Sequence, residues 1–293
     1  MTHDPSPAFG TLSPQAGRGT LQRRSALILA GGAGTRLRPL SSDECPKQFL
    51  RLWRGRSLIE MTFDRIARLV PEDQIFISTN EQYRALTLEH LPRLKPENVI
   101  AEPARRNTAP AIALCCFSIA ERLGDSATIA CLPSDHFIAD EPGFIRVLER
   151  AYAYAESHDD LVTIGITPTD PNTGYGYLEL GDAIEDEVIR LRRFTEKPSR
   201  ETAEEFLRAG NYAWNGGMFI WRASVFRDAL TKASPHLATV TLANYEAMPN
   251  ISIDYALMEK APNVATIRGD FGWSDVGGWD ALRASGAEIP EQF

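Results

Sequence analysis

The sequence has few cysteines, and their spacing suggests neither a metal site nor a disulfide framework. Only four of the 293 residues are cysteine, at Cys45, Cys115, Cys116 and Cys131, and none forms a C-x-x-C pair. The five histidines are scattered. The sequence therefore gives no basis for a zinc site, and we expect the thiols to be reduced and buried, as in a cytoplasmic protein.

An excess of positive charge and long apolar runs are also absent. Lys and Arg total 31 against 39 Asp and Glu, so the net charge is -8 and no global field would hold a nucleic acid. No apolar run approaches the ~20 residues of a membrane span. The apolar stretch 26–30 is too short for a signal peptide and runs straight into glycines. We expect a cytoplasmic protein that binds neither nucleic acid nor membrane, and a phosphorylated substrate would need a local positive pocket.

The composition divides the chain into a polar N-terminal tail and a region that is apolar enough to form a folded domain. Residues 1–24 are rich in Pro, Gly, Ser, Thr and Gln and have no hydrophobic period, which predicts a disordered N-terminal tail. The 43% hydrophobic fraction is enough for a large core, and we expect one catalytic domain over residues 25–293.

Apolar runs and helical patterns alternate from Ser25 onward, which predicts an α/β fold with a mostly parallel sheet. The clearest helical pattern spans about Thr108 to Leu123, with Asn107 or Thr108 as its cap and Pro110 in its first turn. In such sheets ligands bind beyond the carboxyl ends of the strands. Short, continuous apolar runs predict buried strands at Ala26–Ala30, Ile75–Ser78, Val99–Ala101, Thr128–Leu132 and Leu161–Ile166.

The pattern changes after Gly174, and the second half is expected to be a mixed region that closes over the first. The predicted strands there are Tyr175–Leu180, Val188–Phe194 and Gly217–Trp221. The predicted helices lie near Thr202–Ala209, Ser224–Lys232 and Ile253–Ala261.

A glycine-rich turn, Gly31-Gly32-Ala33-Gly34, directly follows the first strand. Glycines let backbone N–H groups approach an anion without hindrance from Cβ, and Arg36 can bind phosphate oxygens. The turn is not a Walker A loop, because no G-K-[ST] follows. It is not a Rossmann fingerprint either, because Leu37 stands where the third glycine is required.

The segment 29–37, followed by Pro46-Lys47-Gln48-Phe49, resembles the signature of the sugar nucleotidyltransferases, in particular the mannose-1-phosphate guanylyltransferase branch. The resemblance implies a Rossmann-like, mostly parallel to mixed sheet sandwiched by helices, the nucleotide-diphospho-sugar transferase fold, without a C-terminal β-helix. It also implies that Arg36 and Lys47 neutralise phosphate charge. The loop residues expected to wrap the triphosphate are Ala30, Gly31, Gly32, Gly34 and Thr35.

Two acidic residues far apart in the chain resemble the family's metal ligands. Asp135 follows the predicted strand 128–132 in Pro-Ser-Asp-His, and Asp275 lies in Trp-Ser-Asp-Val-Gly. By resemblance they hold a catalytic Mg²⁺, a hard cation that carboxylates suit. For His136 we expect structural packing.

Other segments resemble the family's sugar and base pockets. The hexose is expected to contact Gly174, Tyr175, Gly176, Glu196 and Asn215, and its phosphate Lys197. The nucleobase is expected near Glu102, Arg106, Asn107 and Thr108. A Glu102 carboxylate could accept from both N1–H and the N2 amine of guanine. The alternative is that backbone groups near Thr108 read the base.

The resemblance implies transfer of GMP from GTP to mannose 1-phosphate, giving GDP-mannose and pyrophosphate, with Mg²⁺ as the cofactor. The chain stops at Phe293, earlier than is usual in this branch, so a monomer or weak homodimer is expected. Three alternatives stay open: a sister enzyme for another base or sugar, a non-catalytic homologue that binds GDP-mannose, and a generic α/β binding protein.

Overall fold

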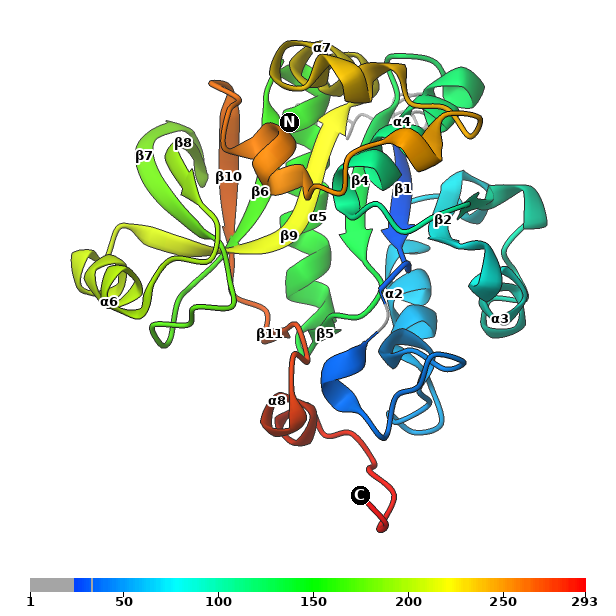
Figure 1. Cartoon of the computed structure of the whole chain (residues 1–293). Coiled ribbons are helices and arrows are strands. Elements are labelled where there is room, and N and C mark those ends of the chain that lie inside the picture. Colours follow the sequence, from blue (N-terminus) through cyan, green and yellow to red (C-terminus); the bar gives the residue numbers. More distant parts are fainter. Residues whose placement is uncertain (1–23, 33) are drawn as a thin grey trace, which may run out of the picture.

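The computed structural model describes residues 24–32 and 34–293 (Figure 1). The predicted tail, apart from its last residue, and Ala33 of the glycine turn lie outside the described residues. Arg24, assigned to the tail from the sequence, is the first residue of strand β1 (Arg24–Leu29). Its Nε donates to Glu156 Oε1 at 2.7 Å, so the strand begins two residues before the predicted start.

One nine-stranded sheet runs through the molecule, with the strand order β3-β2-β1-β4-β9-β6-β10-β8-β7. The pairs among β1 to β4 are parallel, whereas β9 lies antiparallel between β4 and β6. The predicted mostly parallel to mixed sheet is thus confirmed. Besides β1, the strands are β2 (Ile75–Asn80), β3 (Val99–Glu102), β4 (Thr128–Pro133), β6 (Leu161–Ile166), β7 (Tyr177–Glu185), β8 (Val188–Thr195), β9 (Tyr212–Arg222) and β10 (Val264–Gly269).

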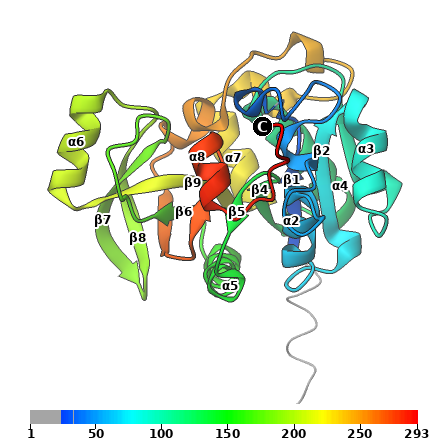
Figure 2. The ribbon, with the colours of Figure 1, turned by 90° about the horizontal axis from the view of Figure 1, so that it is seen from below.

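Helices cover both faces of this sheet. The covering helices are α2 (Leu58–Ile66) and α5 (Glu141–Ser157) on one face and α4 (Thr108–Leu123) and α7 (Ala223–Ala233) on the other. At the two ends of the sheet lie α6 (Arg200–Ala209) and α3 (Arg84–His90) (Figure 2), and α8 (Trp279–Ala284) lies below the sheet in Figure 1. None of the helices in the described part of the chain is long and apolar enough to cross a membrane. No β-helix follows the sheet among the described residues.

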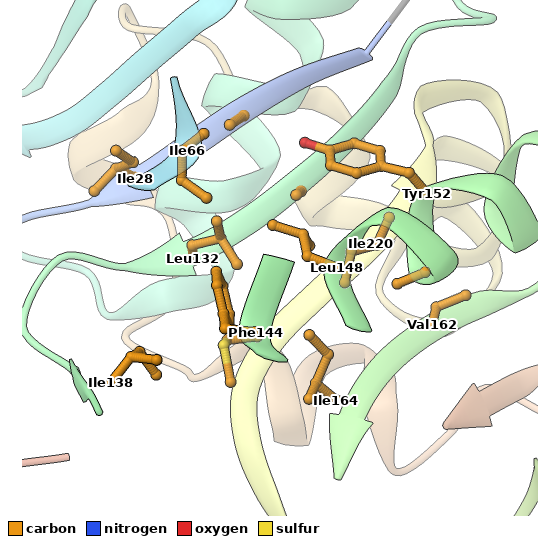
Figure 3. Packing of buried hydrophobic residues seen from close by; sticks show 14 of the residues in the cluster. Ile28, Ile66, Leu132, Ile138, Phe144, Leu148, Tyr152, Val162, Ile164 and Ile220 are labelled. Atoms are coloured by element: carbon orange, nitrogen blue, oxygen red, sulfur yellow. The ribbon is translucent and has the colours of Figure 1, made fainter. Parts of the chain in front are cut away.

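The core on the α5 side is formed where this helix packs on the central strands (Figure 3). Phe144 and Leu148 of α5 meet Ile28, Leu132 and Ile220 of three different strands, and all five are at most 2% exposed. Burial of each such side chain stabilises the fold by roughly 1.5–3 kcal/mol relative to leaving it in water. A continuous apolar core therefore holds α5 against the central strands.

Local capping explains why α4 has the bounds predicted from the sequence. The Asn107 side chain accepts from the Thr108 amide at 2.8 Å, and Pro110 in the first turn needs no hydrogen-bond partner for an N–H. This cap lies directly after β3, so it positions the start of α4 at the edge of the sheet where β3 ends.

The second half does not close over the first as a separate region, which corrects the expectation from the sequence. Its strands extend the same sheet, because β9 pairs with β4. Strand β10 was not predicted, and it lies between β6 and β8. In place of the predicted helix 253–261 there is a short π-helical segment, Asp254–Met258. The positions of β9 and β10 depend on pairing with strands that are distant in sequence, and a local sequence pattern does not predict such pairing.

A second, two-stranded sheet joins β5 (Phe137–Ile138) to β11 (Trp273–Ser274). In this antiparallel pair Trp273 is opposite Ile138. The pairing places the segment that follows β4 beside a segment more than a hundred residues later, and each carries one of the predicted metal ligands.

Candidate active site

An open cleft of about 540 Å³ lies beyond the carboxyl ends of β1, β3 and β4. It is bordered by the glycine turn, the start of α4, the segment after β4 and the loops flanking β7 to β9. Most residues predicted for the site line it: Gly31, Gly32, Glu102, Arg106, Asn107, Thr108, Asp135, Gly174, Tyr175, Gly176, Glu196, Lys197, Asn215 and Asp275. The cleft therefore joins the predicted phosphate, base and sugar segments in one space.

Five predicted residues do not line the cleft. Ala30 is fully buried, and its carbonyl accepts from Gln48 Nε2 at 2.9 Å. Thr35 and Arg36 are exposed beside the turn. Gly34 and Lys47 pack against each other beneath it. Ala30 thus supports the turn from below instead of presenting a side chain to a ligand.

Gly34 is required by the close approach of Lys47. It has φ 60°, and a Cβ there would lie 2.7 Å from both the Cβ and the amide nitrogen of Lys47. Gln48 completes the support, since its amide donates to the carbonyls of Ala30 and Gly32 at 2.9 and 3.0 Å. The short turn Lys47–Phe49 therefore holds the glycine turn in shape.

The buried ammonium of Lys47 connects the two predicted metal ligands. Its Nζ lies 2.8 Å from Asp135 Oδ2 and donates to the backbone oxygen of Asp275 at 2.6 Å. Burial is the largest single effect and raises the pKa of Asp135, but neighbouring charges, that of Lys47 first, and hydrogen bonds together outweigh it, so the pKa falls below its usual value. Asp135 is therefore held as a carboxylate.

Asp275 is oriented by three neighbours. Its Oδ1 accepts from the Tyr175 hydroxyl at 2.9 Å and from the Gly277 amide at 3.0 Å, and its Oδ2 lies 4.0 Å from a nitrogen of Arg36. Tyr175 belongs to the predicted sugar segment and Arg36 to the phosphate turn. Asp275 thus stands where the two substrate regions meet.

Asp135 and Asp275 fit a hard divalent cation, because carboxylates are the ligands that Mg²⁺ prefers. No group of three or more His, Cys, Asp and Glu side chains that could hold a metal occurs within residues 24–32 and 34–293. A cation here would take its remaining ligands from substrate oxygens and water, as is usual for Mg²⁺ in phosphoryl-transfer sites.

His136 packs as expected and stays neutral. Its Nδ1 accepts from Trp273 Nε1 at 3.0 Å, and the two rings meet edge-on. Burial lowers the pKa of His136 to about 4. At neutral pH the imidazole therefore carries no charge that would compete with Lys47.

The predicted base end of the cleft is built around Glu102 at the end of β3. One carboxylate oxygen accepts from Ser78 at 2.6 Å, and the other from the Tyr245 hydroxyl at 2.8 Å. Burial raises the pKa of Glu102, and these two bonds oppose that effect. Each oxygen keeps a further lone pair, so the group can still accept from a ligand.

The N-terminal amides of α4 are already engaged by protein groups. The Thr108 amide donates to Asn107, and the Ala109 amide donates to the carbonyl of Ile251 at 3.1 Å. Pro110 has no N–H. The amides of Thr108 and Ala109 are therefore not free for an anion, and Arg106 is bound to the Glu246 carbonyl at 2.9 Å.

At the predicted sugar end, Glu196 and Lys197 pair with each other. The Glu196 side chain is 6% exposed and lies so close to Gly176 that a Cβ there would be 2.6 Å from its Oε2. Asn215 lies beside them on β9, and its Nδ2 donates to Asp254 Oδ1 at 3.0 Å. Gly176 is therefore required for the approach of Glu196.

Sequence reasoning missed several residues that line the cleft or hold its walls. They are Asn80, Arg105, Tyr245, Asp254 and Trp273. Asn80 Nδ2 donates to the carbonyl of Gly31 at 3.3 Å, and Arg105 Nε donates to Asn80 Oδ1 at 3.3 Å. The strand end at Asn80 could have signalled the first. For Asp254, the sequence shows only a polar residue inside an apolar pattern.

Comparison with known sequences relates this geometry to one family. A family model described as nucleotidyl transferase matches residues 25–292. The chain is 40% identical over 279 residues to a mannose-1-phosphate guanylyltransferase of Klebsiella pneumoniae, an alignment covering 87% of this chain and 58% of the relative. The chain thus spans somewhat over half the length of this relative.

Solved structures share the fold. A structure titled mannose-1-phosphate geranyltransferase, from Thermus thermophilus, superposes with a TM-score of 0.81 at 36% identity, covering 90% of this chain and 79% of that one. A structure titled mannose-6-phosphate isomerase, from Helicobacter pylori, gives a TM-score of 0.71 at 29% identity, covering 85% of this chain and 99% of that one.

Proposed function

Because this chain belongs to the nucleotidyl transferase family, we propose that it transfers GMP from GTP to mannose 1-phosphate and releases pyrophosphate. The observation that carries the proposal is the position of Asp275, which contacts the phosphate-turn residue Arg36 and the sugar-segment residue Tyr175 at once. A cleft that joins a glycine turn to a hydroxyl-binding pocket through paired carboxylates suits the joining of a nucleotide to a sugar phosphate.

In the proposed reaction an oxygen of the sugar phosphate attacks the α-phosphorus of GTP. The new P–O bond forms as the bond from the α-phosphorus to the leaving pyrophosphate oxygen breaks. The nucleophile is already an anion, so no protein base or covalent residue is needed, and the protein contributes positioning and charge stabilisation. The neutral His136, with its pKa of about 4, is consistent with this lack of a protein base.

The charged residues divide into three roles. Asp135 and Asp275 would hold Mg²⁺, which supplies positive charge against the phosphate oxygens when it is bound. Arg36 and Lys47 stabilise the departing pyrophosphate, and Lys197 holds the attacking phosphate. To contact phosphate, Lys47 would have to exchange its bond with Asp135 for one to a phosphate oxygen.

The test is release of pyrophosphate measured across four nucleoside triphosphates and several hexose 1-phosphates. We expect GTP with mannose 1-phosphate to give the highest kcat/KM. A higher value with UTP or dTTP would indicate a sister enzyme. Binding of GDP-mannose without any turnover would indicate a non-catalytic homologue. Interconversion of mannose 6-phosphate and fructose 6-phosphate serves as the control for an isomerase, in which the glycine turn would have no role.

A further inference from the structure

Asp254 faces the cleft from a segment that no motif indicated. It opens the π-helical segment Asp254–Met258 and lines both the main cleft and an adjoining recess of about 410 Å³ beside Lys197. Its position is set by the start of α4. The Ile253 amide donates to Thr108 Oγ1 at 2.9 Å, and the Ile251 carbonyl accepts from Ala109 at 3.1 Å. Two hydrogen bonds to α4, one to the Thr108 side chain and one from the Ala109 backbone, therefore anchor the segment that carries Asp254.

The neighbouring Asn215 amide is almost fully committed to protein partners. Its Oδ1 accepts from Thr163 Oγ1 at 3.2 Å and from the Gly217 amide at 3.1 Å, and one of its N–H groups donates to Asp254. Asn215 can thus offer a ligand only one further donor. The strong acceptors left at this end of the cleft are the carboxylates of Glu196 and Asp254.

Two carboxylates near each other raise the free energy of the ligand-free cleft. Burial, and then the Glu196 charge, raise the pKa of Asp254 to about 6, and hydrogen bonds from its own backbone and from Ser252, followed by the Lys197 charge, only partly oppose this. The Lys197 ammonium is paired with Glu196 and not with Asp254. A purely structural carboxylate would gain more from direct pairing with the cation. The arrangement instead leaves an acceptor directed at the hydroxyl-binding end.

We infer that Asp254 accepts a hydrogen bond from a ring hydroxyl of the hexose and takes part in selecting the sugar, an inference that rests on the proposed function. Glu196 and Asp254 then accept hydroxyl hydrogens from two sides of Asn215. A sugar that lacks the hydroxyl, or holds it in the other configuration, leaves a desolvated carboxylate unpaired, which selects against that sugar.

The variant Asp254→Asn tests the contact with little change of shape, because its Oδ1 can still accept from Asn215. The exposed Asp228 on α7, outside the cleft, provides the matched control Asp228→Asn. Calorimetric titration with GDP-mannose and with GDP separates the hexose contribution from the nucleotide contribution. We expect Asp254→Asn to weaken GDP-mannose about tenfold or more while GDP is unaffected. Equal weakening of both ligands, or no weakening, would overturn the inference.

Deoxy sugars distinguish direct contact from indirect positioning through Asn215. The values of kcat/KM are compared for mannose 1-phosphate and its 2-, 3-, 4- and 6-deoxy analogues in wild type and Asp254→Asn. If Asp254 contacts one hydroxyl directly, wild type should prefer mannose 1-phosphate over the analogue lacking that hydroxyl by about tenfold or more in kcat/KM. In Asp254→Asn this ratio should fall close to one. A uniform loss over all five sugars means indirect positioning and contradicts the inference. Failure of the proposed function can be told apart from failure of this inference, because the wild type would then release no pyrophosphate. The calorimetric titrations would still show whether Asp254 contacts the hexose.

Discussion

The proposed phosphate end and the proposed sugar end of the cleft compensate the charge of their carboxylates differently. At the phosphate end, Lys47 is buried against Asp135, so cation and anion compensate each other before any ligand arrives. The sugar end also holds an ion pair, between Glu196 and Lys197, but among the described residues Asp254 beside it has no cationic partner, and the side chain that donates to its Oδ1 is the neutral Asn215. The first end is set to exchange partners with charged ligands, and the second offers acceptors to neutral hydroxyls.

This difference follows from the chemistry of the ligands proposed for each end. Phosphate groups and a divalent cation bring strong charges that can displace an existing ion pair without leaving either partner unpaired. Hydroxyl groups cannot displace an ion pair, because a hydrogen bond to a neutral donor is weaker than a charge-assisted one between two ions. The acceptors for a sugar must therefore be available in advance. Substitutions at the two ends should consequently change different kinetic constants.

The largest effect is expected at the phosphate end. Asp135→Asn and Asp275→Asn should each lower kcat by at least about a hundredfold, because each removes a charged ligand proposed for Mg²⁺. Initial rates at saturating Mg²⁺ measure this, and binding of Mn²⁺ by electron paramagnetic resonance gives a readout independent of turnover. Thermal denaturation checks that folding is preserved. A variant with near-normal turnover would show that its carboxylate is not a metal ligand.

Replacing either exposed cation, Lys197 or Arg36, by alanine tests the same difference between the two ends of the cleft. Lys197→Ala should raise the KM for mannose 1-phosphate by roughly tenfold or more and the KM for GTP by less, because Lys197 lies at the sugar end beside Glu196. Arg36→Ala should instead lower kcat, since the charge that it faces grows as pyrophosphate leaves. Reversed effects in steady-state kinetics would mean that the two cations serve the other substrates.

A further substitution examines the base end. Glu102→Gln should narrow the preference for GTP over ATP and UTP by about tenfold, equivalent to roughly 1.4 kcal/mol. The amide keeps one acceptor but loses the charge that guanine's two adjacent donors would meet. Ratios of kcat/KM among the triphosphates measure this preference.

Tyr245→Phe is the matched control for Glu102, because it leaves the carboxylate charged and removes only the hydroxyl that donates to it. A smaller narrowing is expected from this variant. Unchanged ratios in Glu102→Gln would favour base reading by backbone groups near Thr108.

The smallest effect is a pH dependence at the sugar end. With a pKa of about 6, Asp254 is mostly ionised at pH 7.5 and mostly protonated at pH 5.5. The ratio of wild-type to Asp254→Asn kcat/KM for mannose 1-phosphate should therefore fall about fourfold between these values. Each ratio is taken at one pH, so titration of the substrate phosphate cancels.

The charged groups that face Asp254 are Glu196 and Lys197, and Glu259 of its own segment bonds to the Glu196 amide. Neither Glu196 nor Lys197 is altered in the variant. A ratio that stays flat with pH would mean that the charge of Asp254 does not act on the hexose.

The sequence by itself determined those features whose causes are local. The bounds of α4, residues 108–123, and of β6, residues 161–166, agree with the structure, because a side-chain cap and a continuous apolar run act within a few residues. The predicted phosphate and base segments meet in one cleft because the parallel strands β1 to β4 bring their carboxyl ends to the same edge of the sheet. The sheet type, and the meeting of the predicted phosphate and base segments in one cleft, could therefore be anticipated.

Only the tertiary structure decided which partners the polar groups of the cleft have. Lys47 bonds to the backbone of a residue 228 positions away, and Glu102 bonds to Tyr245, 143 positions away. Strand β10 lies between β6 and β8 because it pairs with both, and Asp254 lines the cleft because its segment is hydrogen-bonded to α4. Hydrogen bonds between distant segments depend on how the whole sheet is assembled. The sequence around each partner therefore does not predict these bonds.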